Sequence, residues 1–121
     1  MEIGVDIVKV ERFEKLINDN KFLNKVYSNY EMNYIQQKGV NSVSTMAGLY
    51  CAKEAFLKAI GVGINGEIKL NEISIVHNNN GKPCVELNDK IISVLSKYGL
   101  KQIKISISHD KDYAISECII F

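Results

Sequence analysis

Residues 43–60 read VSTMAGLYCAKEAFLKAI, and Gly61-Val62-Gly63 follows directly. Apolar side chains recur in this stretch at the spacing of one helix face, namely at Met46, Leu49, Phe56 and Ile60. Ser42 or Ser44 can cap the start of such a helix, and glycine commonly ends one. The stretch therefore predicts a long helix over about 43–60 that packs one face against a core.

Shorter elements are predicted on both sides of this helix from hydrophobic periodicity and turn residues. Those expected before it are a strand over 1–8, helices over 9–18 and 29–38, and a short helical piece around 22–26. Those expected after it are strands over 72–77 and 84–87, a helix over 89–98, and strands over 103–108 and 113–120. The order β-ααα-ββ-α-ββ predicts an α+β fold with a mainly antiparallel sheet, in a single domain over residues 1–121.

Capping residues refine two of the predicted helices. Ser28 and Glu31 fit a capping box, in which each side chain bonds the backbone amide of the other residue. Asn88 can cap the helix over 89–98, and the side chains expected to face inward there are Ile91, Ile92 and Leu95.

The charge balance of the chain is nearly neutral. Fifteen basic and fourteen acidic residues among 121 give a net charge of +1, whereas a dedicated nucleic-acid binder usually has a marked basic excess. The sequence has no run of about 18 apolar residues that could span a membrane, and its start lacks the features of a signal peptide. Three widely spaced cysteines, Cys51, Cys84 and Cys118, fit reduced thiols that fill a core. We expect a cytoplasmic protein that binds neither nucleic acid nor membrane.

Two carboxylates, Asp6 in the first strand and Glu54 in the long helix, could form an all-oxygen metal site. Mg²⁺ binds through one or two carboxylates and completes its shell with water and substrate phosphate. Simpler roles fit equally well, because Glu54 and Lys58 have the spacing of a surface ion pair on a helix. Asp6 could likewise be a polar residue at a strand end or a cap for the next helix.

Other candidate residues could contact an anion. Gly61 and Gly63 after Lys58 could let backbone amides approach a phosphate, although helices routinely end in glycine. His109 could be an ordinary turn residue, or it could bond a phosphate or move a proton near neutral pH. The turn 80–83 is most simply a hairpin connection. The one arginine beside fourteen lysines, Arg12, suits recognition of carboxylate or phosphate, although its isolation also fits compositional drift.

Four stretches resemble, in their order along the chain, the motifs of a known family. They are Gly4-Val5-Asp6-Ile7, the stretch 47–64, Asn80-Gly81-Lys82-Pro83 and Ser106-Ile107-Ser108-His109. They resemble motifs of the holo-acyl-carrier-protein synthases, the small bacterial 4′-phosphopantetheinyl transferases. The resemblance extends over almost the whole chain.

The resemblance implies both an activity and an assembly. Such enzymes transfer 4′-phosphopantetheine from coenzyme A to a serine of apo acyl carrier protein, in fatty acid biosynthesis. Adenosine 3′,5′-bisphosphate is the leaving group of this transfer. The implied fold is that of the 4′-phosphopantetheinyl transferases, and the implied assembly is a homotrimer with coenzyme A bound between neighbouring chains.

The resemblance also implies a role for each candidate residue. Asp6 and Glu54 would hold Mg²⁺, and Lys58 would contact a phosphate of coenzyme A. The remaining coenzyme A site would be lined by Gly61, Gly63, Asn80, Gly81, Pro83 and His109. Arg12, with Lys9 and Lys15 near it in the sequence, would contact acidic residues of the carrier protein.

The serine hydroxyl needs a base, which completes an implied catalytic group of Asp6, Glu54, Lys58 and His109. Glu54, acting directly or through a metal-bound water, is the preferred base, because the expected task of His109 is to hold phosphate.

The chain departs from the family pattern at three positions. Leu49 stands where an arginine usually helps to hold coenzyme A, Val62 stands where threonine is common, and Lys25 replaces an arginine. Leu49 removes a charge, and Lys25 keeps the charge but loses the bidentate hydrogen-bonding group of arginine. We therefore expect either that other lysines compensate or that coenzyme A binds more weakly, and none of the three changes touches the two carboxylates. The alternatives are a non-catalytic module that binds coenzyme A or a nucleotide, and a purely structural assembly subunit.

Overall fold

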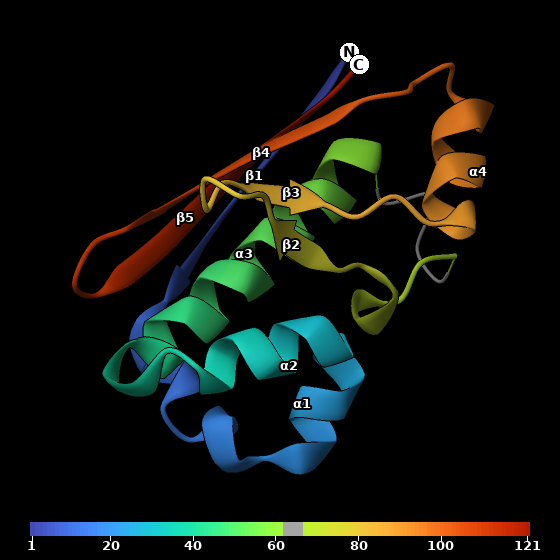
Figure 1. The fold of residues 1–121 in the computed structure, drawn as a ribbon. Helices are drawn as coiled ribbons and strands as arrows, with labels where there is room; N and C mark the ends of the chain where they lie inside the picture. The colour runs from blue at the N-terminus through green and yellow to red at the C-terminus, as the bar shows by residue number, and fades with distance from the viewer. Residues whose placement is uncertain (62–66) are drawn as a thin grey trace.

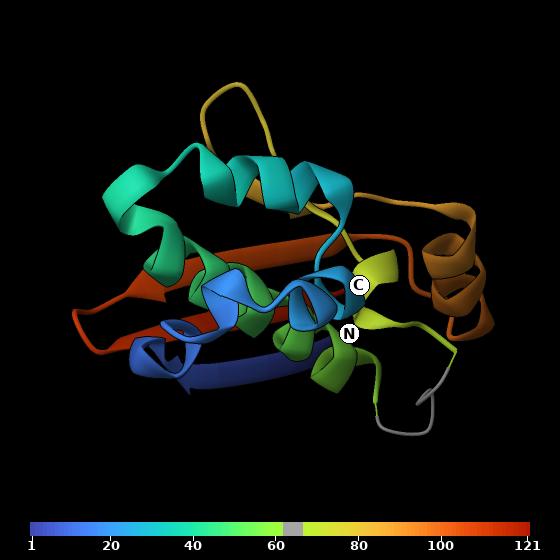
Figure 2. The same ribbon diagram turned by 90° about the horizontal axis from the view of Figure 1, so that it is seen from below.

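Helix α3 (Ser42–Ile60) lies at the centre of the molecule, between a sheet and two smaller helices (Figure 1). The computed structural model describes residues 1–61 and 67–121. On one side of α3 is an antiparallel sheet with the order β1 (Glu2–Lys9), β5 (Tyr113–Ile120) and β4 (Ile103–His109). On the other side are α1 (Asn20–Val26) and α2 (Asn29–Gln36) (Figure 2). The predicted α+β class with antiparallel pairing is confirmed.

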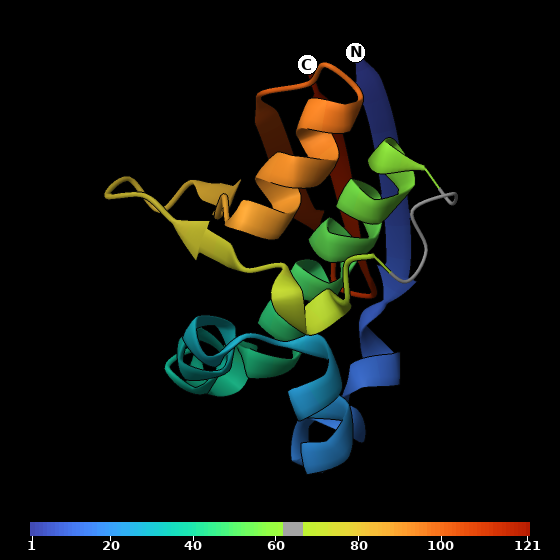
Figure 3. The same cartoon turned by 90° about the vertical axis from the view of Figure 1, so that its right-hand side faces the viewer.

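A hairpin and a further helix complete the described fold. Strands β2 (Ile75–His77) and β3 (Pro83–Val85) pair in a second antiparallel sheet, and their turn projects from the body of the molecule (Figure 3). Helix α4 (Asp89–Lys97) precedes β4. Short 3₁₀ segments are η1 (Val10–Phe13), η2 (Leu16–Asn18), η3 (Gly39–Asn41) and η5 (Leu70–Glu72). Within the described residues, no helix has the length and apolar character needed to cross a membrane.

Strand β1 approaches α3 closely at Gly4. A Cβ atom at this position would lie 2.1 Å from the carbonyl oxygen of Ala55 and 2.5 Å from the amide nitrogen of Ala59. Both distances are well inside van der Waals contact, so only glycine fits here without a backbone shift. The close approach brings the next residue on the same face of β1, Asp6, against the middle of α3.

The prediction of an α-helix over 9–18 was wrong. The segment forms the short turns η1 and η2 instead, and the first α-helix begins at Asn20, where the Asp19 side chain caps it. The Val10 amide donates to the Asp112 carbonyl at 2.9 Å, which ties the start of the segment to the β4–β5 turn. Phe13 is completely buried in the core. Its position in the apolar pattern of this segment reflects that burial, which does not require a continuous helix.

Two details of the helix ends also differ from the prediction. Neither Ser42 nor Ser44 caps α3: the cap residue is Asn41, and the Ser44 hydroxyl donates to its carbonyl at 3.0 Å. In α4, Asn88 caps as predicted, but Ile92 is exposed and Val94 is buried in the core. The Ser28–Glu31 capping box is confirmed. Gly61 ends α3 with φ +90°, a conformation that favours glycine.

A buried ion pair between Lys53 of α3 and Glu31 of α2 joins the helical layer together. Both side chains are fully buried. Lys53 Nζ also donates to the Val26 and Leu70 carbonyls, and Glu31 Oε2 accepts from the Ile75 amide at 2.8 Å. Burial raises the pKa of Glu31 and lowers that of Lys53, while their mutual attraction opposes both shifts. The pair therefore fixes α3 relative to α1, α2, η5 and β2.

Lys53→Met tests this role of the ion pair. We expect it to lower the free energy of unfolding by roughly 3–5 kcal/mol, because Glu31 loses its buried partner. Lys97→Met is the matched control, since Lys97 lies 3.5 Å from Glu67 in an exposed pair, worth at most about 1 kcal/mol. Urea denaturation followed by circular dichroism measures both, and equal midpoints for the two variants would contradict the assignment.

Candidate functional site

Asp6 and Lys58 form an ion pair between β1 and α3. Lys58 Nζ lies 2.8 Å from Asp6 Oδ1, and the hydrogen bond and charge of Asp6 raise the pKa of Lys58. The Asp6 side chain is only 13% exposed. Its second oxygen, Oδ2, is buried and has no hydrogen-bond partner within the described residues. A buried carboxylate oxygen without a partner is costly, so this atom is suited to an additional cation.

Glu54 lies one helical turn before Lys58 and shares its electrostatic environment with Asp6. The charges of both carboxylates raise the pKa of Lys58. The pKa of Tyr50 is raised first by burial, next by the charge of Glu54, and more weakly by Asp6. Asp6 and Glu54 thus both raise the pKa values of Lys58 and Tyr50. The structure therefore brings the two predicted carboxylates to one side of α3.

This carboxylate site, defined as Asp6, Glu54 and Lys58, fits a hard divalent cation. It offers the free Asp6 Oδ2 and the Glu54 carboxylate, which matches the one or two carboxylates typical of Mg²⁺ sites completed by phosphate and water. Within residues 1–61 and 67–121, no cluster of three or more His, Cys, Asp or Glu side chains forms a richer metal site.

A second group of predicted residues surrounds a pocket beside the N-terminal half of α3. The pocket has a volume of about 160 Å³. Its lining residues are Tyr34, Thr45, Gly48, Leu49, His77, Gly81, Pro83, Ile107 and His109. The turn before β3 is held by Asn78, whose side-chain oxygen accepts from the Asn80 and Lys82 amides at 2.9 Å each. The structure thus brings together Gly81, Pro83 and His109, with Asn80 in the same turn.

The carboxylate site and this histidine pocket lie on different sides of α3. Asp6 belongs to β1 and His109 to β4, which are the two outer strands of the three-stranded sheet. On α3, Gly48 and Glu54 are six positions apart, or roughly 120° around the helix and about 9 Å along it. Within one chain the two groups are therefore separated by β5 and by the body of α3.

The remaining predicted residues are Gly61 and Arg12, on the side of the carboxylate site, and Gly63. Gly61 ends α3, three residues after Lys58, whereas Gly63 lies outside the described residues. Arg12 is exposed on η1, where its guanidinium lies 5.7 Å from the centre of the Phe13 ring. The positive charge of Arg12 lowers the pKa of the Tyr50 phenol, whereas burial and Glu54 raise it by larger amounts. Arg12 is therefore close to the carboxylate site.

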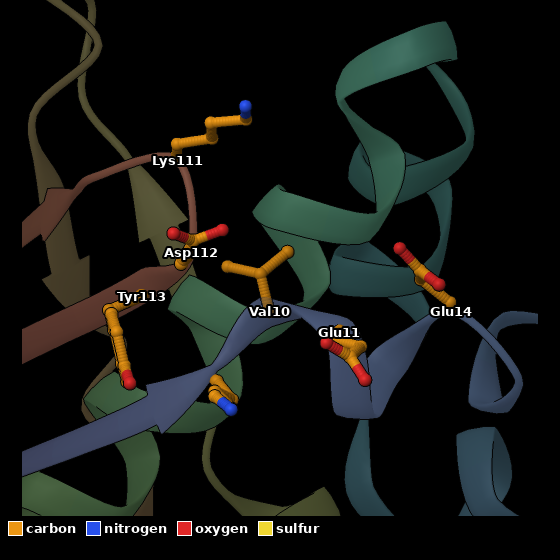
Figure 4. Close-up of a pocket in the computed structure, with 7 residues that line it drawn as sticks. Val10, Glu11, Glu14, Lys111, Asp112 and Tyr113 are labelled. Atoms are coloured by element: carbon orange, nitrogen blue, oxygen red, sulfur yellow. The ribbon is translucent and has the colours of Figure 1, made fainter.

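A hollow of about 400 Å³ lies where the end of β1 meets the β4–β5 turn (Figure 4). Its lining residues are Lys9, Val10, Glu11, Glu14, Lys111, Asp112 and Tyr113. None of the predicted coenzyme or metal residues lines it. Because Glu11 and Glu14 alternate with Lys9, Arg12 and Lys15 in the sequence, the segment is mixed in charge and is not a uniform basic patch.

Several pocket and site residues were missed from the sequence. Tyr34 and His77 stack with ring centres 4.0 Å apart on the pocket wall, and Lys38 lies 4.5 Å above the Tyr34 ring. The spacing of Tyr50 and Glu54 by four residues was a signal that could have placed them on one face of the long helix. Lys38 lies beyond the end of α2, so helical spacing alone could not place it over Tyr34. Nothing in the sequence pointed to His77, because its position depends on the packing of β2 against α2.

Comparison with known proteins gives this geometry a family. Residues 2–118 match the model of the 4′-phosphopantetheinyl transferase superfamily. The chain belongs to this superfamily, and it is therefore a transferase.

Within the superfamily, the chain is similar to holo-[acyl-carrier-protein] synthases. That of Fusobacterium nucleatum is 43% identical over 119 residues, which cover 98% of this chain and 96% of the relative. The crystal structure of the Helicobacter pylori synthase in complex with coenzyme A matches with a TM-score of 0.83 and 30% identity, over 98% of this chain and 99% of that one. The Neisseria meningitidis synthase matches with a TM-score of 0.88 and 29% identity, over 99% and 97%. The predicted family and fold are confirmed.

The thiol of Cys51 provides a test of the packing beneath the carboxylate site. It donates to the Asp6 carbonyl at 3.0 Å, and its pKa is raised to about 12 by burial, followed by the charge of Asp6. Since alkylation requires the thiolate, Cys51 should not react with iodoacetamide at neutral pH while the chain is folded. Raising the pH increases the thiolate population, so labelling should appear only toward the alkaline limit of the folded state.

Exposed Cys84 is the internal control for this experiment, and buried Cys118, whose pKa is also raised to about 12, should behave like Cys51. Peptide mass spectrometry should therefore find one modified cysteine in the folded protein and three after unfolding. Equal labelling of Cys51 and Cys84 in the folded protein would show that the packing is wrong.

Proposed function

We propose that this chain is a holo-acyl-carrier-protein synthase that transfers 4′-phosphopantetheine from coenzyme A to a serine of apo acyl carrier protein. The observation that carries the proposal is the carboxylate site, with its free buried oxygen Asp6 Oδ2 beside Glu54 and the ammonium group of Lys58. Phosphoryl transfer depends mainly on positioning and on neutralising charge, and this site offers groups for both.

Mg²⁺ is the metal that we propose for the carboxylate site. Asp6, through Oδ2, and Glu54 would hold it. When bound, the ion would neutralise charge on the pyrophosphate of coenzyme A and polarise the phosphorus centre. The donor set supports this choice, because both ligands are carboxylate oxygens and leave the remaining positions to phosphate and water.

Lys58 and Glu54 have complementary tasks in the proposed reaction. A lysine ammonium has three donors, so Lys58 can keep its bond to Asp6 Oδ1 and still donate to a phosphate. It would stabilise the negative charge on the departing adenosine 3′,5′-bisphosphate. The Glu54 carboxylate would accept the proton of the carrier serine as its oxygen attacks phosphorus. His109 remains the second choice of base.

We propose that the histidine pocket holds the nucleotide end of coenzyme A. Its contributors from the prediction are Gly81, Pro83 and His109, with Asn80 in the adjoining turn. Gly61, three residues after Lys58 at the end of α3, would instead belong to the carboxylate half of the site. Gly63, outside the described residues, remains a prediction from the motif alone. Leu49 lines the pocket without a charge, and Lys38 on the Tyr34 ring is a cation that could compensate for it.

A homotrimer is part of the proposal, because it would unite the two halves of the site. Neighbouring chains of a cyclic trimer meet through different surfaces, so the β1 side of one chain can face the β4 side of the next. The carboxylate site of one chain and the histidine pocket of its neighbour could then bind a single coenzyme A. Within the described residues of one chain, β5 and the body of α3 lie between the two groups.

The outer face of the sheet supports association of the chains. Ile3, Val5 and Ile7 of β1 are 64%, 55% and 59% exposed, and Ile115, paired with Ile7, is exposed on the same face. A contiguous apolar face on a sheet is unfavourable in water and typical of an interaction surface. Burial of this face between copies of the chain would contribute to the stability of the trimer.

The carrier protein is the proposed macromolecular partner. We propose that Arg12, exposed on η1 near the carboxylate site, contacts acidic residues of the carrier. Opposite charge would steer the encounter and orient the carrier serine toward Glu54. We further propose that the chain acts as one domain in the cytoplasm, in fatty acid biosynthesis.

The reaction is tested by incubating the protein with apo acyl carrier protein, coenzyme A and Mg²⁺, followed by mass spectrometry of the carrier. We expect the carrier to gain one phosphopantetheine group. Glu54→Gln should lower the rate by about 10² or more, because it removes both the base and a metal ligand. Its folding should be retained, since Glu54 takes no part in the buried Lys53 network.

Glu86→Gln is the matched control, because Glu86 is an exposed glutamate outside both halves of the site. It should retain full activity. Coenzyme A binding without any mass gain would instead favour the non-catalytic module, and full activity of Glu54→Gln would remove Glu54 from the mechanism.

A further inference from the structure

His109 is held in one orientation by the first half of α3. Its Nε2 lies 2.9 Å from the Ser44 carbonyl oxygen. The ring also packs directly over Gly48, where a Cβ atom would lie 2.5 Å from Nε2 and 2.8 Å from Cε1. Gly48 therefore provides the space that the imidazole occupies.

The bond to Ser44 fixes which nitrogen carries the proton in the neutral ring. A carbonyl oxygen can only accept, so Nε2 must donate to it. In the neutral imidazole this leaves Nδ1 with a lone pair, and two acceptors cannot bond each other. The Nδ1 atom of a neutral His109 would therefore repel an anionic oxygen, and only the imidazolium form could donate to it.

Within the part of the chain that the structure describes, the other titratable groups around the pocket are Tyr34 and His77 on its wall, Tyr30 against His77, Lys38 above Tyr34, Lys82 in the turn, and Asp110 next to His109. Burial, followed by the charge of Lys38, lowers the pKa of His77 and favours its neutral form. The α3 residues on this wall, Ser44, Thr45 and Gly48, carry no charge. Lys38 attracts an anionic ligand in either form of His109. The second ionisation of a phosphate, with a pKa of about 6, would favour binding at the higher pH, so tighter binding at the lower pH would come from His109.

We propose that Gly48 and the Ser44 carbonyl are positioning elements that make His109 a proton-dependent phosphate ligand. Binding of a phosphate group would then be coupled to uptake of one proton from solvent at Nδ1. This inference rests on the proposed function, since it takes the phosphate to be one of coenzyme A. It assigns to Gly48 a role in ligand binding rather than in helix packing.

Gly48→Ala separates these roles, because alanine favours a helix interior, whereas its Cβ would displace the His109 ring and only touch Ile107 Cγ2 at 3.2 Å. Titration calorimetry of the full chain with coenzyme A, at about pH 6 and about pH 8, spans the range in which imidazole changes charge. We expect the wild type to bind on the order of tenfold more tightly at the lower pH, as fits loss of one charge-assisted hydrogen bond. Gly48→Ala should bind with little pH dependence while its thermal unfolding is unchanged or improved.

His109→Ala and the double variant Gly48→Ala/His109→Ala provide the controls. In the absence of His109, adding Gly48→Ala should have no further effect on binding. Calorimetry in two buffers of different ionisation enthalpy should detect proton uptake by the wild type alone. Proton uptake that persists in His109→Ala, or a wild-type pH profile in Gly48→Ala, would overturn this inference. No binding of coenzyme A by the wild type at either pH would instead contradict the proposed function.

Discussion

The Lys53–Glu31 ion pair is the interaction on which the arrangement of the helices depends. Two opposite charges are fully buried, and their remaining hydrogen-bonding capacity is directed to backbone groups of α1, η5 and β2. Such a pair is a poor source of stability compared with well-packed apolar side chains, but it strongly penalises any arrangement that separates its members. The pair therefore selects one position of α3 relative to its neighbours.

Lys53 and Glu54, which are consecutive in α3, therefore face different parts of the molecule. Lys53 points into the helical layer, and Glu54, about 100° further around the helix, lies on the side of Asp6 and Lys58. The close approach of β1 at Gly4 fixes the other side of the same helix. A helix held from both sides can present a carboxylate to a strand residue with little freedom to move, as the proposed metal site would require.

The sequence was most informative where local chemistry determines local structure. The helix over 43–60, the Ser28–Glu31 capping box and the Asn88 cap each depend on residues close in the chain, and the structure has all three. The prediction of a helix over 9–18 was wrong because the Val10 amide bonds the Asp112 carbonyl, a contact between residues about a hundred positions apart. Ser44 likewise looked like a cap, but its carbonyl holds His109.

The candidate site was likewise predictable from the sequence only in part. The motif order identified the family, and with it Asp6, Glu54, Lys58 and His109 as residues to examine. The sequence could not indicate that Asp6 and His109 lie on the two outer strands of one sheet, because strand order depends on long-range pairing. Tyr34 and His77 come together only through the packing of β2 on α2. Their stacking was beyond reach of periodicity or spacing.

In the proposed trimer, one active site combines the carboxylate site of one chain with the histidine pocket of the next. This arrangement is tested most directly by co-refolding equal amounts of Glu54→Gln and His109→Ala chains and measuring phosphopantetheine transfer. If each variant alone has little activity, random mixed trimers should recover about a quarter of the wild-type rate, because that fraction of interfaces pairs an intact Glu54 with an intact His109. Activity no higher than the average of the two variants would mean that each site is built within a single chain.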